Sequence, residues 1–500
     1  MRNCIHIYLW GEEIGSLMWR DESRNSYFLY NPEYLKNSTI EPFPLVAPKP
    51  SIRYRTFESE EERKYQRLPS FLADSLPDNW GNTLFEQWYA DQHLPMADLT
   101  PLYKLAFIGE RGMGALEFRP DAQLTPYVEE INIGELAQLA HKIFMQKEAL
   151  HIAPGEELTK QLLIEVGTSA GGRQPKAIIA IHRETGEIRS GQIAGQKGYD
   201  YYILKFGDAS RSSAELEMAY YEMACDAGID IMPSRLFPAG GEQHFMTMRF
   251  DRPNGEKVHT QTLAAINPSA KSYEELMLTC RRLRMPDGTG EEIFRRMVFD
   301  YLANNTDDHD KNVSFIMSPQ GRWALAPAYD ITFVFNKGGY QPEREHCMLM
   351  RGKLCDWSKE DMLLFAKDNG IKGAEKIIAQ VVKAICSFTE YATKYAVAPE
   401  WIARVNACLT AHLAEWGYND KQEAVDEPEE WRLSNGQYVT DIHMEAAYKG
   451  NVHLCATIDG KPQKYVFRPK TPEYDLIMQN NISEVPLEKM KEWVAKYICR

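Results

Sequence analysis

The sequence predicts an α+β fold built in successive parts, with strand patterns dominating the first half, helices following, and a small α+β module at the end. Three observations support this order. Short apolar or alternating runs separated by turns recur up to about residue 260. Apolar residues at helical spacing then dominate as far as residue 418. Beyond the acidic, proline-containing run 419–430, strand patterns return and a helix pattern closes the chain.

The composition is that of an ordinary globular protein. The chain has 500 residues, of which 44% are hydrophobic, so we expect two to four domains with sizeable cores. Neither a membrane-spanning run nor a signal-peptide core is evident, which predicts a cytoplasmic protein without membrane partners. Nine scattered cysteines without a C-x-x-C pair indicate reduced thiols. The net charge of -14 argues against non-specific binding of nucleic acid by the whole surface.

The first 125 residues predict a β-rich subdomain. Runs 6–10, 14–19 and 26–30 predict a small antiparallel sheet, and the proline-rich stretch 42–50 predicts an extended connection. Helical patterns occupy 68–93. The glycine-punctuated phrase 107–118 predicts a turn that leads into a strand.

Residues 126–260 predict a second strand-rich region, which contains a small-residue loop. A helix is expected over 133–149, followed by the segment 166–176, VGTSAGGRQPK, and the strand 177–181. Residues without bulky side chains allow backbone N–H groups to approach phosphates. The alternative is that this loop is only a turn, because it matches neither a Walker A motif nor G-x-G-x-x-G.

Lys205 is the one basic residue in the apolar strand 201–206. A buried lysine is costly unless it meets an anion, although a lysine on an edge strand can simply point to water. The following helix, 213–224, carries two acids, and Glu217 is a better candidate partner for Lys205 than Glu215. The alternative role of both acids is to favour the positive end of that helix. The next strand, 245–252, runs into polar chain and suits an edge whose backbone could bond an adenine.

The loop 304–312, NNTDDHDKN, follows a helix whose apolar residues 293–302 face a core. Asp307 and Asn312 have the D-x-x-x-x-N spacing of a kinase catalytic loop, in which the Asp accepts a hydroxyl proton and the Asn binds magnesium. After an apolar hairpin, Asp330 occupies the place of the Asp in a D-F-G loop, although the tripeptide reads Asp-Ile-Thr. The alternative is an acidic surface turn or helix cap.

Two further acids, Asp308 and Asp310, crowd the same loop. They could strengthen metal binding, but we expect them to face water, where salt screens their charge.

Taken together, the segments 169–176, 249–252 (RFDR), 306–312 and 328–330 (AYD) resemble the HipA family of bacterial toxin kinases. The resemblance extends from about residue 5 to 415 and includes 72–81 and 109–118. It implies a two-lobed, protein-kinase-like fold with an amino-terminal β-rich subdomain (1–125), a kinase N-lobe (126–260) and a helical C-lobe (261–418). Residues 419–500, a linker and a small carboxy-terminal α+β extension, lie outside it.

The resemblance implies an ATP- and Mg²⁺-dependent serine/threonine kinase and assigns its site. Asp307 would be the catalytic base, with Lys205 and His309 beside it, and Asn312 and Asp330 would bind the metal. His309 would contact phosphate or orient the loop. The implied ATP-binding set is Ser169, Ala170, Gly171, Gly172, Arg173, Gln174, Lys176, Lys205, Met248, Phe250, Asp307, His309, Asn312 and Asp330. Ser169 is also the expected autophosphorylation site, where a phosphate would expel the loop and silence the enzyme.

The resemblance further implies a toxin that phosphorylates a protein target, such as a component of translation. Its partner would be a small helix-turn-helix antitoxin of the HipB type, through which alone it would meet DNA. Two other readings stay open from the sequence. One is a small-molecule kinase. The other is a catalytically idle member that acts as co-repressor of the DNA-bound antitoxin, although Lys205, Asp307, Asn312 and Asp330 are all present.

Overall fold

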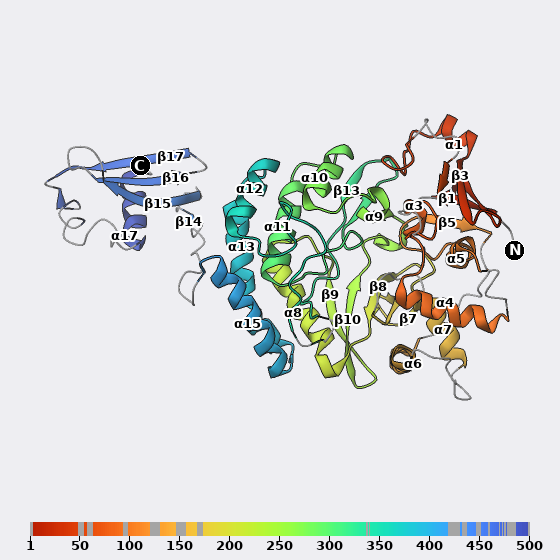
Figure 1. The fold of residues 1–500 in the computed structure, drawn as a ribbon. Coiled ribbons are helices and arrows are strands. Elements are labelled where there is room, and N and C mark those ends of the chain that lie inside the picture. Colours follow the sequence, from red (N-terminus) through yellow and green to blue (C-terminus); the bar gives the residue numbers. More distant parts are fainter. Residues whose placement is uncertain are drawn as a thin grey trace. The chain divides into compact units, whose positions relative to one another are not determined.

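The chain divides into two compact units, Met1–Asn419 and Asp420–Arg500, each described by itself. The computed structural model describes most of the first unit and the strands and last helix of the second (Figure 1). The described residues are 4–48, 55–57, 64–93, 99–120, 131–146, 157–167, 174–336, 339, 341–418, 431–432, 438–446, 452–458, 461–469, 471–472, 474, 477 and 487–498.

The unit 1–419 opens with the predicted antiparallel sheet, which has five strands in the order β4-β3-β2-β1-β5. Alternation of buried and exposed residues along β1 and β2 places one face of this sheet on the core. The short helices that follow supply most of the apolar side chains opposite it. The elements are β1 Cys4–Leu9, β2 Glu12–Arg20, β3 Asn25–Tyr30, α1 Pro32–Asn37, β4 Arg55–Phe57, α3 Ser70–Ala73, α4 Asn79–Asp91, α5 Pro101–Ile108 and β5 Leu116–Arg119.

A second five-stranded antiparallel sheet, in the order β7-β6-β8-β10-β9, forms the next layer. Helix α8 packs on β9 and β10, and α7 packs on β6 and α4. Strand β8, which ends at Lys205, is the central strand, so this lysine is not the edge-strand residue that the alternative reading required. The elements are α6 Ile133–Gln146, α7 Glu157–Gly167, β6 Lys176–His182, β7 Ile188–Ser190, β8 Tyr199–Lys205, α8 Ser213–Asp226, β9 Ser234–Ala239 and β10 Glu242–Met248.

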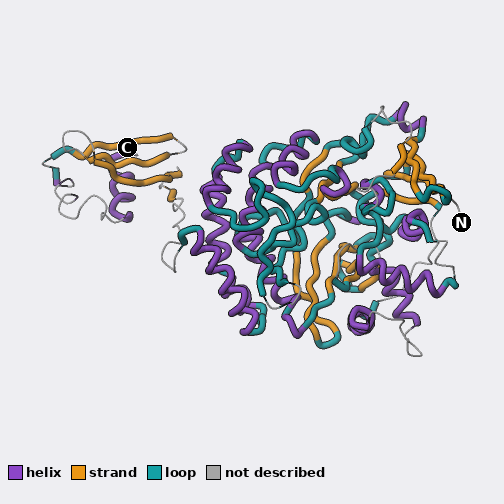
Figure 2. Tube along the Cα trace, viewed as in Figure 1, coloured by secondary structure: helices purple, strands orange, loops and turns teal. Residues whose placement is uncertain are grey.

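The remainder of this unit is mostly helical, as Figure 2 shows, with a small three-stranded sheet β11-β12-β13. Helix α11 packs against α13 and α15, and its buried face ends at the loop 303–313. Helix α12 starts at a capping box of Ser358 and Asp361, which satisfies donors of the first turn. The elements are β11 His259–Thr262, α9 Leu263–Ile266, α10 Tyr273–Arg282, α11 Thr289–Leu302, β12 Ser314–Met317, β13 Trp323–Leu325, α12 Lys359–Asn369, α13 Ala374–Cys386, α14 Phe388–Lys394 and α15 Pro399–Glu415.

One continuous apolar core runs through these parts, from Ile5 to Trp416. Polar contacts also join the first 120 residues to both later regions. Trp80 donates to the carbonyl of Lys176 in β6, and Ser70 donates to the carbonyl of Ala265 in α9. The amino-terminal part is therefore bonded to both the second sheet and the helical region.

The second unit contains the antiparallel sheet β14-β15-β16-β17 and helix α17, which packs on β15. Its own core includes Val439, Leu454, Phe467 and Trp493. The elements are β14 Trp431–Arg432, β15 Tyr438–Ala446, β16 Val452–Ile458, β17 Lys461–Phe467, and α17 Leu487–Trp493 with a π-helical turn, Val494–Ile498. None of the helices in the described parts of either unit is both long and apolar enough to cross a membrane.

Candidate active site

Lys205 stands between two carboxylates. Its ammonium group, with 9% of the side chain exposed, forms ion pairs with Glu217 from α8 and with Asp330 from the loop after β13. Glu217 is thus the helix acid that pairs with Lys205. The arrangement brings a strand lysine, a helix glutamate and a loop aspartate to one point, as in protein kinases.

The charges of Lys205 and Asp330 stabilise each other, whereas burial raises the pKa of Glu217 and lowers that of Lys176. Burial alone would lower the pKa of Lys205, but Asp330 and Glu217 outweigh it and the pKa is raised. Burial likewise opposes ionisation of Asp330, yet Lys205 and Lys176 hold its pKa well below the usual range. Lys176, the cross-strand neighbour of Lys205, is buried, and burial lowers its pKa against the pull of Asp330. Two cations therefore face one carboxylate, an arrangement suited to receiving phosphate oxygens.

The backbone at Asp330 is held in an uncommon conformation. Its φ of 55° lies in the left-handed region, which costs a non-glycine residue on the order of 1 kcal/mol. Tyr329 fixes the preceding position, because its hydroxyl donates to the carbonyl of Lys311 at 2.7 Å and lies 2.6 Å from the hydroxyl of Ser314. The carboxylate of Asp330 remains one-third exposed. The loop thus presents Asp330 while keeping it accessible.

Helix α11 delivers the loop that carries Asp307. The Asp307 side chain is 59% exposed, as a base that meets an external hydroxyl must be. Asn312 donates its Nδ2 to the carbonyl of Asp307 at 2.7 Å, which closes the loop. His309 accepts at Nδ1 from the backbone N–H of Lys311, and its Nε2 lies 3.7 Å from Asp307 Oδ1. These contacts tie the His309 ring to its own loop.

The expectation that Asp308 faces water is wrong. Its side chain is 3% exposed and accepts from the hydroxyl of Tyr273 at 2.8 Å and from the backbone N–H of Cys347 at 2.7 Å. His346 lies 3.1 Å away through Nδ1. Asp310 is partly exposed and pairs with Lys271 at 2.8 Å. Burial of Asp308 is possible because donors from distant parts of the chain replace its water.

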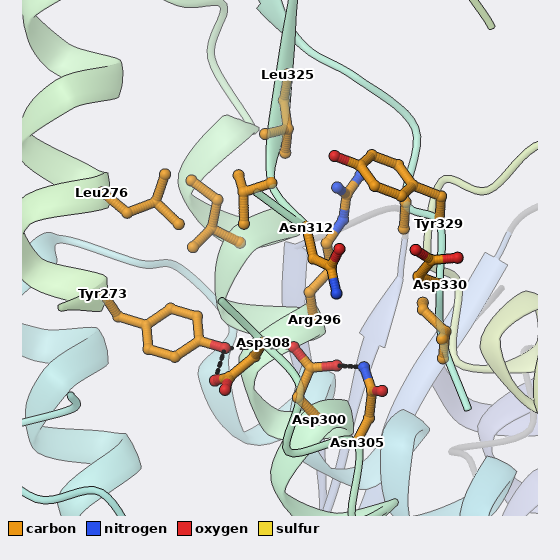
Figure 3. Close-up of a pocket in the computed structure, with 14 residues that line it drawn as sticks. Tyr273, Leu276, Arg296, Asp300, Asn305, Asp308, Asn312, Leu325, Tyr329 and Asp330 are labelled. Atoms are coloured by element: carbon orange, nitrogen blue, oxygen red, sulfur yellow. Dashed lines mark hydrogen bonds between the residues drawn. The ribbon is translucent and has the colours of Figure 1, made fainter. Parts of the chain in front are cut away.

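Asn312 and Asp330 line the same cavity (Figure 3). The cavity also reaches Asp300 and Asp308 behind the loop. Because Nδ2 of Asn312 is used by Asp307, its Oδ1 and the Asp330 carboxylate are the donors available to a cation. Such hard oxygens suit Mg²⁺, which is commonly held by one or two protein ligands together with substrate phosphates. No group of three or more His, Cys, Asp or Glu side chains suited to a metal occurs within the described ranges, so the fit is to a shared site of this kind.

The backbone N–H groups of residues 248–250, at the end of β10, differ in whether they already have a hydrogen-bond partner. The N–H of Met248 donates to the carbonyl of Pro233, and the N–H of Arg249 donates to that of Tyr201. Neither is open to a base, which counts against Met248 as an N–H donor to adenine. No partner for the N–H of Phe250 occurs among the described backbone groups. The Phe250 ring stacks on Tyr329, with centroids 6.0 Å apart, and so connects this strand end to the Asp330 loop.

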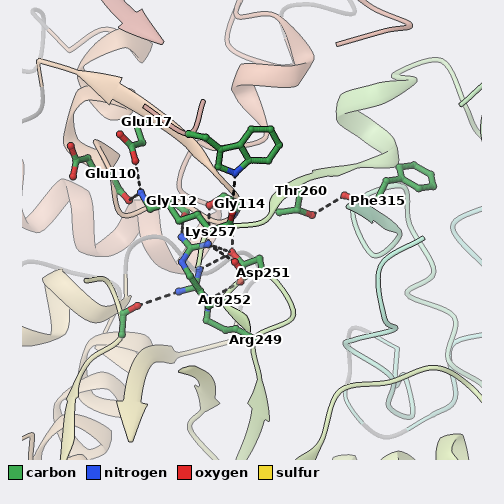
Figure 4. Close-up of polar contacts among 12 residues, drawn as sticks. Glu110, Gly112, Gly114, Glu117, Arg249, Asp251, Arg252, Lys257, Thr260 and Phe315 are labelled. Carbon is green, nitrogen blue, oxygen red and sulfur yellow. Dashed lines mark hydrogen bonds and ion pairs between the residues drawn. The ribbon is translucent and has the colours of Figure 1, made fainter. Parts of the chain in front are cut away.

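Directly beyond Phe250, Asp251 forms a closed ionic cluster with two arginines (Figure 4). Arg249 is bidentate to Asp251, and Arg252 also donates to the carbonyls of Gly112 and Gly114. The N–H of Gly114 donates to Asp251 at 2.7 Å. This glycine has φ 78°, and a Cβ there would lie 3.0 Å from Thr260. The cluster clamps the loop before β5 to the end of β10.

The other predicted ATP-binding residues fall in two groups. Ser169, Ala170, Gly171, Gly172 and Arg173 lie outside the described residues. Gln174 is described and exposed, and Lys176 faces the cluster around Asp330. The residues that the sequence interpretation missed are Asp78, whose carboxylate binds Lys311 at 2.7 Å, and the group of Tyr273, Asp300, His346 and Cys347. No spacing signal connects these residues along the chain.

Family models match two parts of the chain. The model of the HipA N-terminal domain matches residues 5–119, and that of the HipA-like C-terminal domain matches 168–388. A Haemophilus influenzae protein described as "Putative kinase" is 28% identical over 210 residues, which cover 37% of this chain and 60% of that protein. The chain therefore spans less than two-thirds of this curated relative.

A solved structure gives the same fold. The chain matches one from the complex of HipA, HipB and operator DNA of the Shewanella oneidensis MR-1 toxin–antitoxin system with a TM-score of 0.59 at 17% identity. The match covers 83% of this chain and 97% of that one. At this identity the likeness establishes the fold, a two-lobed, protein-kinase-like architecture.

Proposed function

Because the chain belongs to the HipA family, we propose that it is an ATP- and magnesium-dependent serine/threonine protein kinase that acts as the toxin of a toxin–antitoxin pair. The observation that carries the kinase proposal is the position of Lys205, buried and bonded to both Glu217 and Asp330. The second carboxylate, partly exposed in a cavity with Asn312, supports a site for a metal and a nucleotide tail.

Each residue has a chemical role in this proposal. Asp307 takes the proton of the acceptor hydroxyl, whose oxygen then bonds to the γ-phosphorus as the bond to the leaving ADP breaks. Lys205 and Lys176 hold phosphate oxygens, and Asn312 and Asp330 hold Mg²⁺. When bound, Mg²⁺ neutralises the charge that develops on the transferred group. His309 keeps the loop in shape, and Phe250 offers its backbone N–H to the base.

Incubation with γ-labelled ATP and magnesium tests the proposal. We expect labelled phosphoserine or phosphothreonine on protein from the wild type. Asp307→Ala should lose the label, and the matched variant Asp310→Asn, which changes an acid of the same loop that forms an ion pair with Lys271, should keep it. Label on a small molecule would instead support a small-molecule kinase. No label in any sample would favour the idle co-repressor reading.

Self-phosphorylation at Ser169 is a separate part of the proposal. A phosphate there adds nearly two negative charges to a loop that precedes Lys176 and should silence the enzyme. Ser169→Ala should abolish self-labelling, whereas Thr168→Ala, its neighbouring hydroxyl, should not. Persistent label on the same peptide in Ser169→Ala would remove this assignment.

The proposed partner is a small helix-turn-helix antitoxin of the HipB type, through which the chain meets DNA. The net charge of -14 suits a basic partner and disfavours direct DNA binding. In a gel-shift experiment the chain alone should leave operator DNA unshifted and should supershift a complex of antitoxin and DNA. A shift by the chain alone would contradict the indirect contact.

A further inference from the structure

Asp308, the residue beside the proposed base, connects three segments of the helical region. Its buried carboxylate contacts Tyr273 at the start of α10, the Nδ1 of His346 and the backbone N–H of Cys347. A buried carboxylate is retained only where donors replace its hydration, and three donors meet here. The position of Cys347 is therefore bonded directly to the loop that carries Asp307.

The segment 346–350 has little freedom beyond this contact. The ring of His346 stacks on Trp357 at 4.1 Å, and Trp357 stacks in turn on Tyr301 of α11. At the other end, Leu349 exchanges backbone hydrogen bonds with the start of α10, accepting from the N–H of Tyr273 and donating to the carbonyl of Lys271. Asp308 and Trp357 thus hold the beginning of the segment, and the start of α10 holds it at Leu349.

The residue placed by these contacts lies against the proposed base. Cys347 is exposed, and its Sγ is 3.9 Å from Oδ1 of Asp307. Lys205, which is proposed to hold phosphate, is buried, whereas the side chain of Asp307 is 59% exposed. An acceptor hydroxyl must reach Asp307 from its solvent side, where Cys347 lies.

We propose that Asp308 is a positioning residue that fixes the segment 346–350, and that Cys347 in this segment forms a wall of the acceptor-binding site beside Asp307. The acceptor-binding role of this wall rests on the proposed kinase function. The placement of Cys347 by Asp308 stands on the hydrogen bonds alone. The acceptor class, a polypeptide hydroxyl, follows from the proposed kinase function, and Cys347 would lie beside that hydroxyl next to the base.

Alkylation of Cys347 tests the placement without requiring activity. The full chain is treated with iodoacetamide, and the rate at Cys347 is followed by mass spectrometry, with the exposed Cys225 and Cys386 as internal references. Asp308→Ala removes both the charge and the hydrogen bonds, whereas Asp308→Asn removes the charge and keeps an acceptor oxygen. We expect Asp308→Ala to speed alkylation of Cys347 about tenfold over Asp308→Asn, because only the former frees the segment. Equal rates in the two variants, both folded by near-ultraviolet circular dichroism, would overturn the placement.

Kinetics test the role in transfer. With dephosphorylated casein and histone as acceptors, Asp308→Ala should lower kcat about 30-fold while the KM for ATP stays within about twofold, because misplaced groups slow transfer without weakening nucleotide binding. Asp310→Asn is the matched control and should behave as wild type. Cys347→Trp should raise the KM for the acceptor and leave that for ATP unchanged. An equal rise of both KM values, or unchanged kcat in Asp308→Ala, would contradict the wall.

The two proposals fail separately. If the wild type transfers no phosphate to any acceptor, the kinase function is wrong and the wall with it, while the alkylation rates still decide whether Asp308 holds Cys347. If the wild type is active and the alkylation rates are equal, only this inference is wrong.

Discussion

Two clusters of charged side chains in this chain can be compared, because each joins carboxylates to buried cations. Around Lys205, one cation meets two carboxylates, and a second lysine, Lys176, faces them. Around Asp251, one carboxylate meets two arginines (Figure 4). The pKa of Asp330 and that of Asp251 are both held below the usual range against burial, by Lys205 and by Arg249 respectively.

The difference lies in access. Asp251 is fully buried, and its partner Arg252 also donates to the carbonyls of Gly112 and Gly114, so the cluster is closed. Asp330 is one-third exposed and lines a cavity with Asn312. A depressed carboxyl pKa therefore does not distinguish a site from a structural clamp in this chain. The two are distinguished by whether a carboxylate oxygen is accessible, as it is in Asp330 and is not in Asp251.

Replacement of Asp330 should give the largest effect on activity. Asp330→Asn removes the charge that faces Lys205 and Lys176, and we expect phosphoryl transfer to fall by a factor on the order of 10³. The free energy of unfolding should fall less than in Asp251→Asn, because Glu217 still pairs with Lys205 and the side chain of residue 330 is partly solvated. Labelled-ATP assays and urea unfolding measure the two. A stable variant with normal activity would break the comparison.

Replacement of Asp251 should show the opposite pattern. Asp251→Asn leaves two buried guanidinium groups, and the loss in the free energy of unfolding should be about 3–5 kcal/mol. Activity per folded molecule should be retained. Glu117→Gln is the matched control, because Glu117 pairs with Lys257 at the same interface and keeps some contact with water. We expect about 1 kcal/mol for the control. A loss of similar size in both variants would show that the Asp251 cluster stabilises the fold no more than the Glu117–Lys257 pair does.

The acid Asp300 adds a pH-dependent term. Burial, reinforced by the charge of Asp308, raises the pKa of Asp300 to about 8, and Asn305 and Tyr273 bond to the same carboxyl group. The folded state then holds a proton that the unfolded chain releases above about pH 4. Stability should fall as pH rises towards 8, by up to about 1.4 kcal/mol per pH unit from this group.

Asp300→Asn should remove that slope, because an amide resembles the protonated acid and does not titrate. In urea unfolding from pH 5 to 9, the free energy of unfolding of the variant should therefore rise relative to that of the wild type up to about pH 8. Above that pH the difference between the two should be constant. Parallel curves would mean that Asp300 is ionised in the folded protein throughout.

The half-exposed pair of Lys311 and Asp78 should give the smallest effect. Their contact is 2.7 Å, with 39% and 28% of the side chains exposed. Such pairs contribute about 0–1 kcal/mol. A double-mutant cycle of Lys311→Met and Asp78→Asn should therefore give a coupling energy below about 1 kcal/mol. A larger value would place this pair with the closed cluster of Asp251.

Much of the fold and the centre of the site could be predicted from local signals. The strand and helix patterns, the spacing from Asp307 to Asn312, and a lysine inside an apolar strand are all readable over a few residues. The burial of Asp308 could not be predicted in this way, because its partners Tyr273 and His346 are 35 and 38 residues away in the chain. The same holds for Arg252, whose carbonyl partner at Gly112 is 140 residues distant. From the sequence alone a charged side chain is expected to face water, because the distant donors that allow its burial cannot be identified.

The attachment of the first 120 residues has a consequence for dissecting the protein. Their apolar side chains complete a core that continues to Trp416, and Trp80 and Ser70 bond to main-chain groups of both later regions. A chain begun at residue 126 would expose the apolar side of those regions and leave carbonyl groups without donors. We therefore expect residues up to 419 to melt in a single calorimetric transition, and a truncated catalytic fragment to aggregate rather than work alone.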